Sequence, residues 1–376
     1  MKPLSLYIHI PFCKQKCNYC DFYSKPCTDI EGYINALCAH IEKESQLYKE
    51  YEITTIFIGG GTPSLLDEFC IQKLCKTIKN SLNLAHSVEF SIEANPCTVT
   101  KEKLTAYIEN GINRISIGLQ SANGNELKTL GRIHTLAEFE NAFSLARQVG
   151  FKNINVDIMY ALPSQTTSDL LKTIDYVSNF APEHISAYCL KIEEGTVFYK
   201  QRSSLDLPSE DEEYKMYLAL CSELEKRGYN QYEISNFAKS GKECKHNLVY
   251  WLSKEYVGFG PSAHSFISGT RYFYEKDIEK YKNTATSVDF MPEKHYEDLT
   301  EIEPCSMEEY VMLRLRLSQG INLAEFYSKF GVDFESAYPN SVEFYNDSYL
   351  IKENGAVHFS PKGFFVSNYI ISKILF

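Results

Sequence analysis

The sequence has little of what marks membrane-spanning or nucleic-acid-binding proteins. It contains no run of about 18 consecutive apolar residues, the length that predicts a transmembrane helix. Basic residues are also in deficit, because 38 Lys and Arg stand against 49 Asp and Glu, which gives a net charge of -11. Such a surface is a poor match for nucleic acid or for anionic lipid. We therefore expect no nucleic-acid partner and no membrane span.

A secretion signal is missing as well. The apolar start LSLYIHIPF is interrupted by His9 and Pro11, and Phe12 stands where a lipoprotein signal would need a small residue. We interpret this stretch as a buried strand of a cytoplasmic protein, in which the 12 cysteines stay reduced. The remaining composition, 44% hydrophobic and 23% charged over 376 residues, is that of a globular protein with one large and one smaller domain.

One pattern repeats through the first 235 residues. Apolar, strand-like runs occupy residues 4–10, 54–60, 88–94, 114–120, 154–160 and 184–190, and each is followed by a turn and an amphipathic stretch. Six such units predict a parallel sheet with helices outside, either an incomplete (β/α)6 barrel or an open doubly wound sheet. Eight units, which a complete barrel needs, do not fit before the pattern changes.

After Tyr232 the pattern breaks, and we expect three parts: residues 1–235, a connecting region 236–302, and a C-terminal domain 303–376. In the connecting region HNLVYW reads as irregular or antiparallel structure, and a hairpin is expected around SGTRYFYE. The last part begins with a helix over SMEEYVMLRLRLSQ and a second over LAEFYSKF, and closes with a hairpin-like segment from LIKENGAVHF to the end. This order resembles a small α+β, winged-helix-like domain, although the segment is not markedly basic.

Polar side chains alternate with apolar ones along the strands. Glu89, Ser91 and Glu93 share one face of their strand. The same parity places Ser116, Gly118 and Gln120 together on the next strand, and Asn155 with Asp157 on the one after it. In parallel α/β folds, sites form at the carboxyl ends of the strands. We therefore expect Glu93 to point into a site, whereas solvent exposure is a fair interpretation of Glu89.

Three cysteines follow the first strand at the same end. Cys13, Cys17 and Cys20 stand at C-x3-C-x2-C, a spacing that can hold iron or zinc. Structural zinc usually has four ligands, and no second cysteine pair is evident, although His9 could in principle be the fourth. In a 4Fe–4S cluster three thiolates leave one iron open to a small chelating molecule. The spacing favours such a cluster over zinc or coincidence.

These motifs resemble a known family. CKQKCNYC, with an aromatic residue before the last cysteine, is similar to the signature loop of the radical S-adenosylmethionine (SAM) superfamily. The ordered set LYIHIPFCKQKCNYCDF, IGGGTPS, SIEANP, RISIGLQS and VDIMYALPSQ resembles the branch of oxygen-independent coproporphyrinogen III oxidase and the HemW-type haem chaperones. The resemblance implies an incomplete (β/α)6 barrel with a 4Fe–4S cluster. It also implies that SAM chelates the open iron and is cleaved to a 5′-deoxyadenosyl radical.

The resemblance also implies site residues. Cys13, Cys17 and Cys20 would bind the cluster, and the SAM contacts would come from Tyr7, Tyr19, Gly60, Gly61, Thr62, Glu93, Gln120, Arg132, Asp157 and Lys191. Glu93 would take the ribose hydroxyls. The residues alone leave alternatives open: Thr62 could be an N-cap with Pro63 at the first helical position, and Lys191 a surface lysine.

Within this branch, the motifs favour the haem chaperones. The oxidases that the chain resembles carry a further cysteine where Phe22 stands, and a longer N-terminal arm. HNLVYW matches an HNxxYW motif of the chaperone members, so His246, and with it His264 in GPSAHSF, are candidate haem ligands. From pattern alone, a buried aromatic corner with a hydrogen-bonded histidine remains the simpler interpretation of HNLVYW.

We therefore expect a haem chaperone that binds haem reversibly, since neither histidine lies in a CxxCH attachment motif. Its partners would be haem and haem-accepting proteins, including transient contacts with membrane haem proteins. The alternative is a radical SAM oxidoreductase that acts on a porphyrinogen. The sequence leaves open whether the protein is a monomer or a homodimer.

Overall fold

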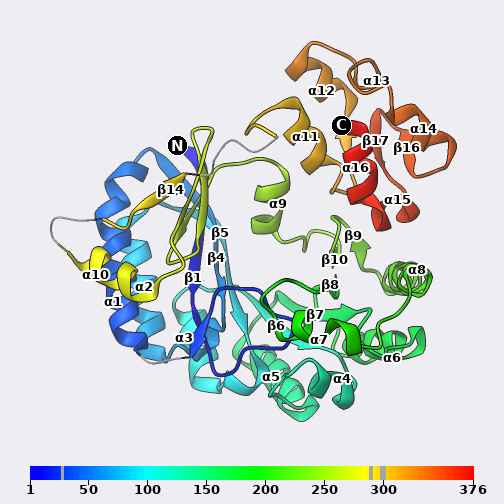
Figure 1. Ribbon diagram of the computed structural model, residues 1–376. Helices are drawn as coiled ribbons and strands as arrows, with labels where there is room; N and C mark the ends of the chain where they lie inside the picture. The colour runs from blue at the N-terminus through cyan, green and yellow to red at the C-terminus, as the bar shows by residue number, and fades with distance from the viewer. Residues whose placement is uncertain (27–28, 288–290, 297–301) are drawn as a thin grey trace.

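The protein is described by a computed structural model that covers residues 1–26, 29–287, 291–296 and 302–376. A curved twelve-stranded sheet carries helices on its outer side, and a separate group of helices and short strands forms the C-terminal part (Figure 1). The strand order is β14-β13-β12-β11-β1-β4-β5-β6-β7-β8-β10-β9. Within these ranges the sheet keeps two edges, β14 and β9, so the barrel is incomplete, as predicted.

Six parallel strands form the middle of the sheet. They are β1 (Lys2–Ile10), β4 (Tyr51–Gly60), β5 (Leu84–Ala94), β6 (Arg114–Gln120), β7 (Ile154–Tyr160) and β8 (His184–Cys189). Each pairs in parallel with the next. They correspond one by one to the six apolar runs of the sequence, so the prediction of a six-unit parallel sheet is confirmed.

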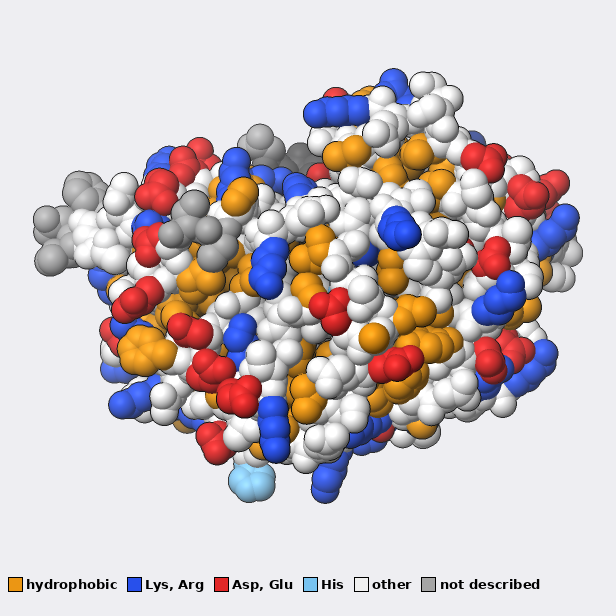
Figure 2. Space-filling model, turned by 90° about the horizontal axis from the view of Figure 1, so that it is seen from below, with side chains coloured by type: hydrophobic (Ala, Val, Ile, Leu, Met, Phe, Trp, Pro, Cys, Tyr) orange, Lys and Arg blue, Asp and Glu red, His pale blue; other side chains and the backbone are white. Residues whose placement is uncertain are grey.

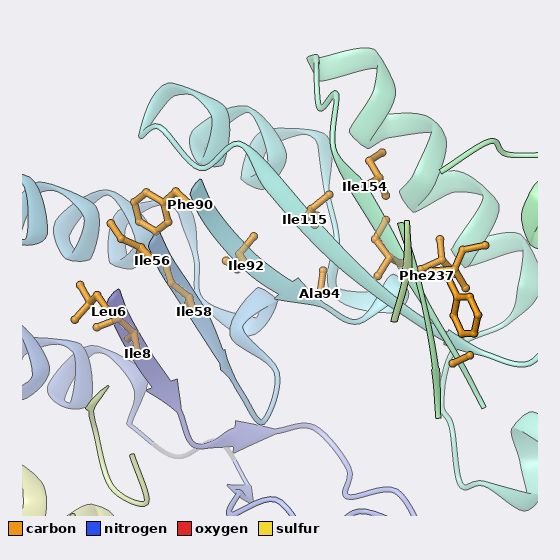
Figure 3. Packing of buried hydrophobic residues seen from close by; sticks show 14 of the residues in the cluster. Leu6, Ile8, Ile56, Ile58, Phe90, Ile92, Ala94, Ile115, Ile154 and Phe237 are labelled. Carbon is orange, nitrogen blue, oxygen red and sulfur yellow. The ribbon is translucent and has the colours of Figure 1, made fainter. Parts of the chain in front are cut away.

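Helices cover the outer face. They are α1 (Ile30–Glu44), α2 (Glu68–Ser81), α3 (Lys101–Glu109), α5 (Leu136–Val149), α6 (Thr167–Ser178) and α8 (Glu210–Lys226). The short helices α4 (Gly124–Thr129) and α7 (Val197–Gln201) follow β6 and β8 beside the cysteine loop. The 3-10 turns are η1 (Ser45–Tyr48), η2 (Pro63–Leu65), η3 (Pro96–Thr98) and η4 (Arg202–Ser204). Alternate strand residues such as Leu6, Ile58 and Ile92 are fully buried against these helices (Figure 3). Burying each contributes about 1.5–3 kcal/mol. The residues between them point to the inner face of the sheet, which can therefore carry polar side chains.

Both edges of the sheet come from the region after β8. On one edge β11 (Tyr256–Phe259) pairs in parallel with β1, which the sequence did not predict. The antiparallel strands β12 (His264–Ile267), β13 (Thr270–Tyr274) and β14 (Lys294–Tyr296) follow, and β12 with β13 confirms the hairpin expected around SGTRYFYE. On the other edge stand the antiparallel β10 (Asn236–Ala238) and β9 (Asn230–Gln231).

The other elements before the C-terminal part are short. A two-stranded pair, β2 (Phe12–Cys13) with β3 (Lys25–Pro26), lies beside the cysteine loop, and α10 (Ile278–Thr286) packs on α1. HNLVYW forms the helix α9 (Lys245–Trp251), so the expectation of irregular or antiparallel structure there was wrong. No helix in the described part of the chain has the length and apolarity to cross a membrane.

The C-terminal part is winged-helix-like. Its helices are α11 (Met307–Arg314), α12 (Leu323–Phe330), α13 (Phe334–Ala337), α14 (Ser341–Asn346), α15 (Pro361–Phe365) and α16 (Ser367–Leu375). Its three strands, in sheet order, are β15 (Ile321–Asn322), β17 (Ala356–Phe359) and β16 (Leu350–Glu353).

Two boundaries in this part differ from the sequence prediction. The first helix ends at Arg314 rather than continuing to residue 319, since Ser318 N donates to Tyr232 O and Leu317 bridges Glu233. The hairpin ends at Phe359, and the remainder is helical because Pro361 occupies the first turn and Ser360 caps it by accepting from Gly363 N.

Candidate functional site

The cysteine loop lies at the carboxyl ends of the parallel strands. β1 ends at Ile10, Cys13 follows in β2, and Cys17 and Cys20 lie in the loop, all three partly exposed. Figure 1 shows this dark blue loop beyond the strand ends, and Figure 2 views the molecule from that end, where apolar side chains reach the surface among charged ones.

Hydrogen bonds hold the loop in place. Asn18 N donates to Leu130 O at 3.0 Å, and Phe198 N donates to Asn18 O at 2.9 Å. The backbone of the cysteine loop is therefore positioned by the segments that follow β6 and β8.

Two of the three sulfur atoms receive hydrogen-bond donors. Thr62 Oγ1 donates to Cys13 Sγ at 3.4 Å, and Arg132 Nη1 lies 3.6 Å from Cys17 Sγ. The other guanidinium nitrogen, Nη2, donates to Gly118 O at 2.6 Å, which fixes the arginine between the loop and β6. Hydrogen bonds from neighbouring groups are typical of metal-binding side chains. At the third thiol, Cys20, burial raises the pKa to about 11, and the backbone of Phe22 offsets this in part. In the described part of the chain no group of three or more His, Cys, Asp or Glu side chains is close enough together to hold a metal ion, so a cluster on Cys13, Cys17 and Cys20 stays a prediction.

His9 does not offer a ready fourth ligand. One ring nitrogen, Nδ1, lies 3.0 Å from Tyr7 Oη, and the other, Nε2, lies 3.0 Å from Tyr23 O. The side chain is buried, and burial lowers the pKa of His9 to about 4, partly offset by the Tyr23 carbonyl. A neutral His9 therefore ties the cysteine loop to β1.

The glycines at the end of β4 allow a close approach to β1 and to the cysteine loop. Gly60 has φ +113°, and a Cβ there would lie 2.6 Å from the His9 ring; at Gly61 a Cβ would lie 2.6 Å from Phe12 O. The segment is bound to the loop as Gly61 N donates to Ile10 O and Thr62 N to Phe12 O. Thr62 does precede a helical turn with Pro63 first, but its hydroxyl bonds Cys13 instead of capping. Thr62 therefore occupies the N-cap position before Pro63, as the alternative interpretation expected, but its side chain makes no capping hydrogen bond.

Two carboxyl groups face the interior beside the glycines. Glu93 Oε2 accepts from Gly60 N at 3.0 Å, and burial, with the nearby Asp157, raises the pKa of Glu93 to about 8. Asp157 accepts from Ser116 Oγ at 3.0 Å and from Asn155 Nδ2 at 2.7 Å, and burial raises its pKa too. Such carboxyls can accept hydrogen bonds from the hydroxyls of a polar ligand. The strand parity thus placed both correctly.

The other predicted SAM residues differ in how far they are buried. Gln120 ends β6 with a positive φ of 73°, a strained conformation of the kind that gathers at functional sites. Tyr7 is half-buried, and burial followed by the charge of Glu93 raises the pKa of its phenol. Tyr19 packs on the buried cluster that contains Leu130 and Met159. Lys191 follows β8 at the same end, with an exposed side chain.

Comparison with known proteins identifies the family. Residues 7–177 match the model of the Radical SAM superfamily, and residues 306–366 match that of the HemN C-terminal domain. The heme chaperone HemW of Bacillus subtilis is 36% identical over 99% of both chains. This chain belongs to the HemW family of radical SAM proteins. The Escherichia coli heme chaperone HemW is 36% identical, with 93% of this chain and 92% of that one covered.

A solved structure supports the fold of the whole HemW-family chain. Coproporphyrinogen III oxidase (HemN) of Escherichia coli superposes with a TM-score of 0.83 over 99% of this chain and 90% of that one. Its sequence identity is 20%, so this similarity concerns the fold alone.

The HemW motif HNLVYW closes the far end of the barrel. Glu89 binds the start of α9, where Lys245 N donates to Oε2 at 3.1 Å and His246 N donates to Oε1 at 3.0 Å. Glu89 is 8% exposed, so the expectation of a solvent-exposed glutamate was wrong. The physical reason is that α9, from a distant part of the sequence, covers this end of the sheet (Figure 1).

His246 itself is fully engaged within the protein. Its Nδ1 is hydrogen-bonded to Thr55 Oγ1 at 2.8 Å and its Nε2 to Tyr250 Oη at 2.9 Å, and the ring stacks on Phe57. It is 1% exposed, and burial, with the charge of Arg114, lowers its pKa to about 3. The geometry is that of a buried aromatic corner with a hydrogen-bonded histidine. His264, in contrast, is exposed in β12.

Arg114 is a buried residue of the interior that was not predicted from the sequence. This arginine is 2% exposed at the start of β6, in the interior near Glu89 and Asp157. A signal was available, because Arg114 has the same parity as Ser116 and Gln120. An inward-facing arginine in a parallel strand indicates a buried carboxyl nearby.

Proposed function

We propose that this protein binds haem and delivers it to haem-requiring proteins, without coproporphyrinogen oxidase activity. The observation that carries this proposal is the match to heme chaperones along the whole chain, at 36% identity over 99% of the Bacillus subtilis protein. Haem delivery requires a cargo that can be released, and the sequence has no CxxCH motif for covalent attachment.

We infer that the radical SAM core holds a 4Fe–4S cluster on Cys13, Cys17 and Cys20. When bound, the cluster supplies a redox-active iron that the amino and carboxylate groups of SAM can chelate. Arg132 and Thr62 would hold the sulfurs by their hydrogen bonds, and Glu93 and Asp157 would accept from the hydroxyls of SAM. The remaining proposed contacts to SAM are Tyr7, Tyr19, Gly60, Gly61, Gln120 and Lys191.

The second candidate function is a radical SAM oxidoreductase that acts on a porphyrinogen, and it rests on the match of residues 306–366 to the HemN C-terminal domain. The cysteine loop favours the haem chaperone over this oxidoreductase. Phe22 stands where the resembling oxidases have another cysteine, and its side chain is 69% exposed. A phenyl ring cannot supply the thiol chemistry of that position.

Location and assembly stay predictions. A cytoplasmic location rests on the cysteines, since those that the structure describes are free thiols, as a reducing compartment requires. Haem-accepting proteins are the proposed partners, including transient ones at membranes, and the protein is proposed to be a monomer or a homodimer.

The test compares binding with turnover. The cluster is reconstituted anaerobically, and the protein is titrated with haem, mixed with the apo form of a haem protein, and assayed separately with SAM, dithionite and coproporphyrinogen III. We expect saturable haem binding, transfer to the apo protein and no vinyl product. Vinyl product at turnover without saturable haem binding would establish the oxidoreductase instead.

A further inference from the structure

Three side chains with flat rings lie in a row across the neighbouring strands β12, β13 and β14. In the strand register His264 of β12 pairs with Phe273 of β13, which pairs with His295 of β14. The ring centroids of His264 and Phe273 are 5.2 Å apart and those of Phe273 and His295 are 5.6 Å apart, each pair at an interplanar angle of 26°. Paired residues project from the same face of a sheet, so the row presents imidazole, phenyl and imidazole side by side.

This row lies on the inner face of the sheet. Tyr256 of β11 pairs with Ser5 of β1, which faces the interior because its neighbours Leu4 and Leu6 are buried on the helix side. Tyr256 also pairs with Phe266 of β12, so Phe266 and, two residues before it, His264 share the inner face. Because β12 runs antiparallel to β11, its first residue, His264, lies toward the carboxyl ends of the parallel strands. The row therefore borders the end that carries the cysteine loop.

Accessibility distinguishes this row from the HNLVYW corner. His264 is exposed, and Phe273 and His295 are half-buried. His246 is 1% exposed in the described part of the chain, so no open path leads to its ring from the solvent. A cargo that must enter and leave is served better by the exposed row.

We propose that haem binds on this row, with His264 as its axial iron ligand and Phe273 against its macrocycle. This inference rests on the proposed haem function and assigns the site within it. Imidazole is a common haem ligand, and an axial imidazole stands across the plane of the macrocycle. Phe273, nearly parallel to His264 and 5.2 Å away, then presents its edge to the face of the same macrocycle, a favoured aromatic arrangement.

The row also explains how the cargo can be handed over. All three rings rise from one side, so His264 coordinates the iron from below and the opposite face of the haem points away from the sheet. A recipient protein can supply its own ligand to that face before the bond to His264 breaks. The interaction is a coordinate bond from imidazole nitrogen to iron, so nothing is oxidised or reduced when it forms or breaks.

The test is a titration of the full-length protein with ferric haem, followed by visible absorbance. The variants are His264→Ala and Phe273→Leu, with His246→Asn beside them and His86→Ala as the matched control, since His86 is also exposed but lies on β5. We expect His264→Ala to weaken haem binding at least about tenfold and to change the Soret band, with added imidazole restoring that band. Phe273→Leu should weaken binding by roughly three- to tenfold with an unchanged band.

Each outcome bears on a separate claim. Wild-type affinity and spectrum in both His264→Ala and Phe273→Leu, with saturable binding by the unaltered protein, would overturn the site while leaving the chaperone function intact. Loss of binding in a folded His246→Asn variant alone would assign the haem to the HNLVYW corner. No saturable binding by the unaltered protein would instead refute the proposed function.

Discussion

At the scale of single residues, the two interior carboxyls are the most informative. Burial raises the pKa of Glu93 to about 8 and also raises that of Asp157, so the pair binds more protons in the folded chain than in the unfolded one. The carboxyls repel each other when both are charged, and Arg114 offsets this only in part. A ligand that brings hydroxyl donors or a positive sulfonium relieves that repulsion.

This gives a pH dependence of stability with a defined sign. Between the ordinary pKa of 4.5 and the raised value of about 8, Glu93 holds a proton in the folded state and has lost it in the unfolded state. The free energy of unfolding should therefore fall as pH rises through this window. Glu93→Gln should remove about 1–3 kcal/mol of that fall, measured by urea unfolding at pH 5 and pH 8. An identical pH slope in the variant would contradict the raised pKa.

The same carboxyls should matter for SAM. Glu93→Ala and Asp157→Ala should weaken SAM binding by about 1.5–3 kcal/mol, roughly ten- to a hundredfold, because each removes a buried hydrogen-bond acceptor and leaves a donor of SAM unpaired. Calorimetry on reconstituted protein measures this, and the cluster spectrum should stay intact. Glu50→Ala, at an exposed glutamate, is the control. Unchanged affinity in both variants would show that neither carboxyl contacts SAM.

The cysteines give a third prediction at this scale. Reconstituted protein should hold about four irons and four sulfides per chain, and Cys13→Ala, Cys17→Ala or Cys20→Ala should each abolish this content. Iron and sulfide analysis measures it. Cys305→Ala serves as the control, since Cys305 is an exposed free thiol outside the loop. Stoichiometric zinc in anaerobically purified protein that cannot take up iron and sulfide would refute the cluster.

At the scale of elements, β5 joins the two ends of the barrel. Its Glu93 meets Gly60 near the cysteine loop, and its Glu89, four residues earlier, holds the backbone of α9 at the other end. The strand therefore carries one carboxyl for the candidate SAM site and one for the HNLVYW helix. This division follows from the two-residue periodicity of a strand, which puts both on the inner face.

The anchoring of α9 can be tested directly. Glu89→Ala should lower the free energy of unfolding by about 2–4 kcal/mol, because it leaves the Lys245 and His246 amides without their charged acceptor and Arg114 without a nearby carboxylate. Hydrogen exchange of residues 244–251 should accelerate more than that of β7. Glu52→Ala, at an exposed position of β4, is the control. Unaltered exchange in α9 would mean that Glu89 does not anchor it.

Elements also show what the sequence could predict. The six parallel strands and the inward Glu93 and Asp157 follow from local periodicity, which each strand carries by itself. The burial of Glu89, the sulfur contact of Thr62 and the pairing of β11 with β1 depend on segments far away in the sequence. No local pattern contains these partners, so the sequence predicted the strands but not what fills the barrel between them.

At the scale of the whole molecule, the C-terminal domain docks on β13 at one side of the sheet and on α8 at the other. Arg271 of β13 pairs with Glu309 of α11 at 2.6 Å, while Phe365 of α15 packs on Tyr214 and Tyr217 of α8. Arg271 lies on the same inner face as His264, beside Phe266. The domain is therefore a neighbour of the proposed haem row.

The single tryptophan reports on this docking. Trp251 ends α9, and the guanidinium of Arg316 from the C-terminal domain lies 5.8 Å from the centre of its ring. Among the described residues, Arg271→Ala leaves the carboxylate of Glu309, whose side chain is 3% exposed, with the Cys305 amide as its remaining hydrogen-bond donor. We expect docking to lose about 1–3 kcal/mol, so the Trp251 emission should shift to the red at lower urea than in the unaltered protein.

A double-mutant cycle separates this ion pair from the haem row. Arg271→Ala with Glu309→Ala should cost less than the sum of the two single changes, because the pair is lost only once. Haem affinity should change little in Arg271→Ala, since the proposed contacts belong to His264 and Phe273. Strict additivity would show that the ion pair does not hold the domain. A large loss of haem affinity would place the C-terminal domain within the haem site, and delivery would then require the domain to move.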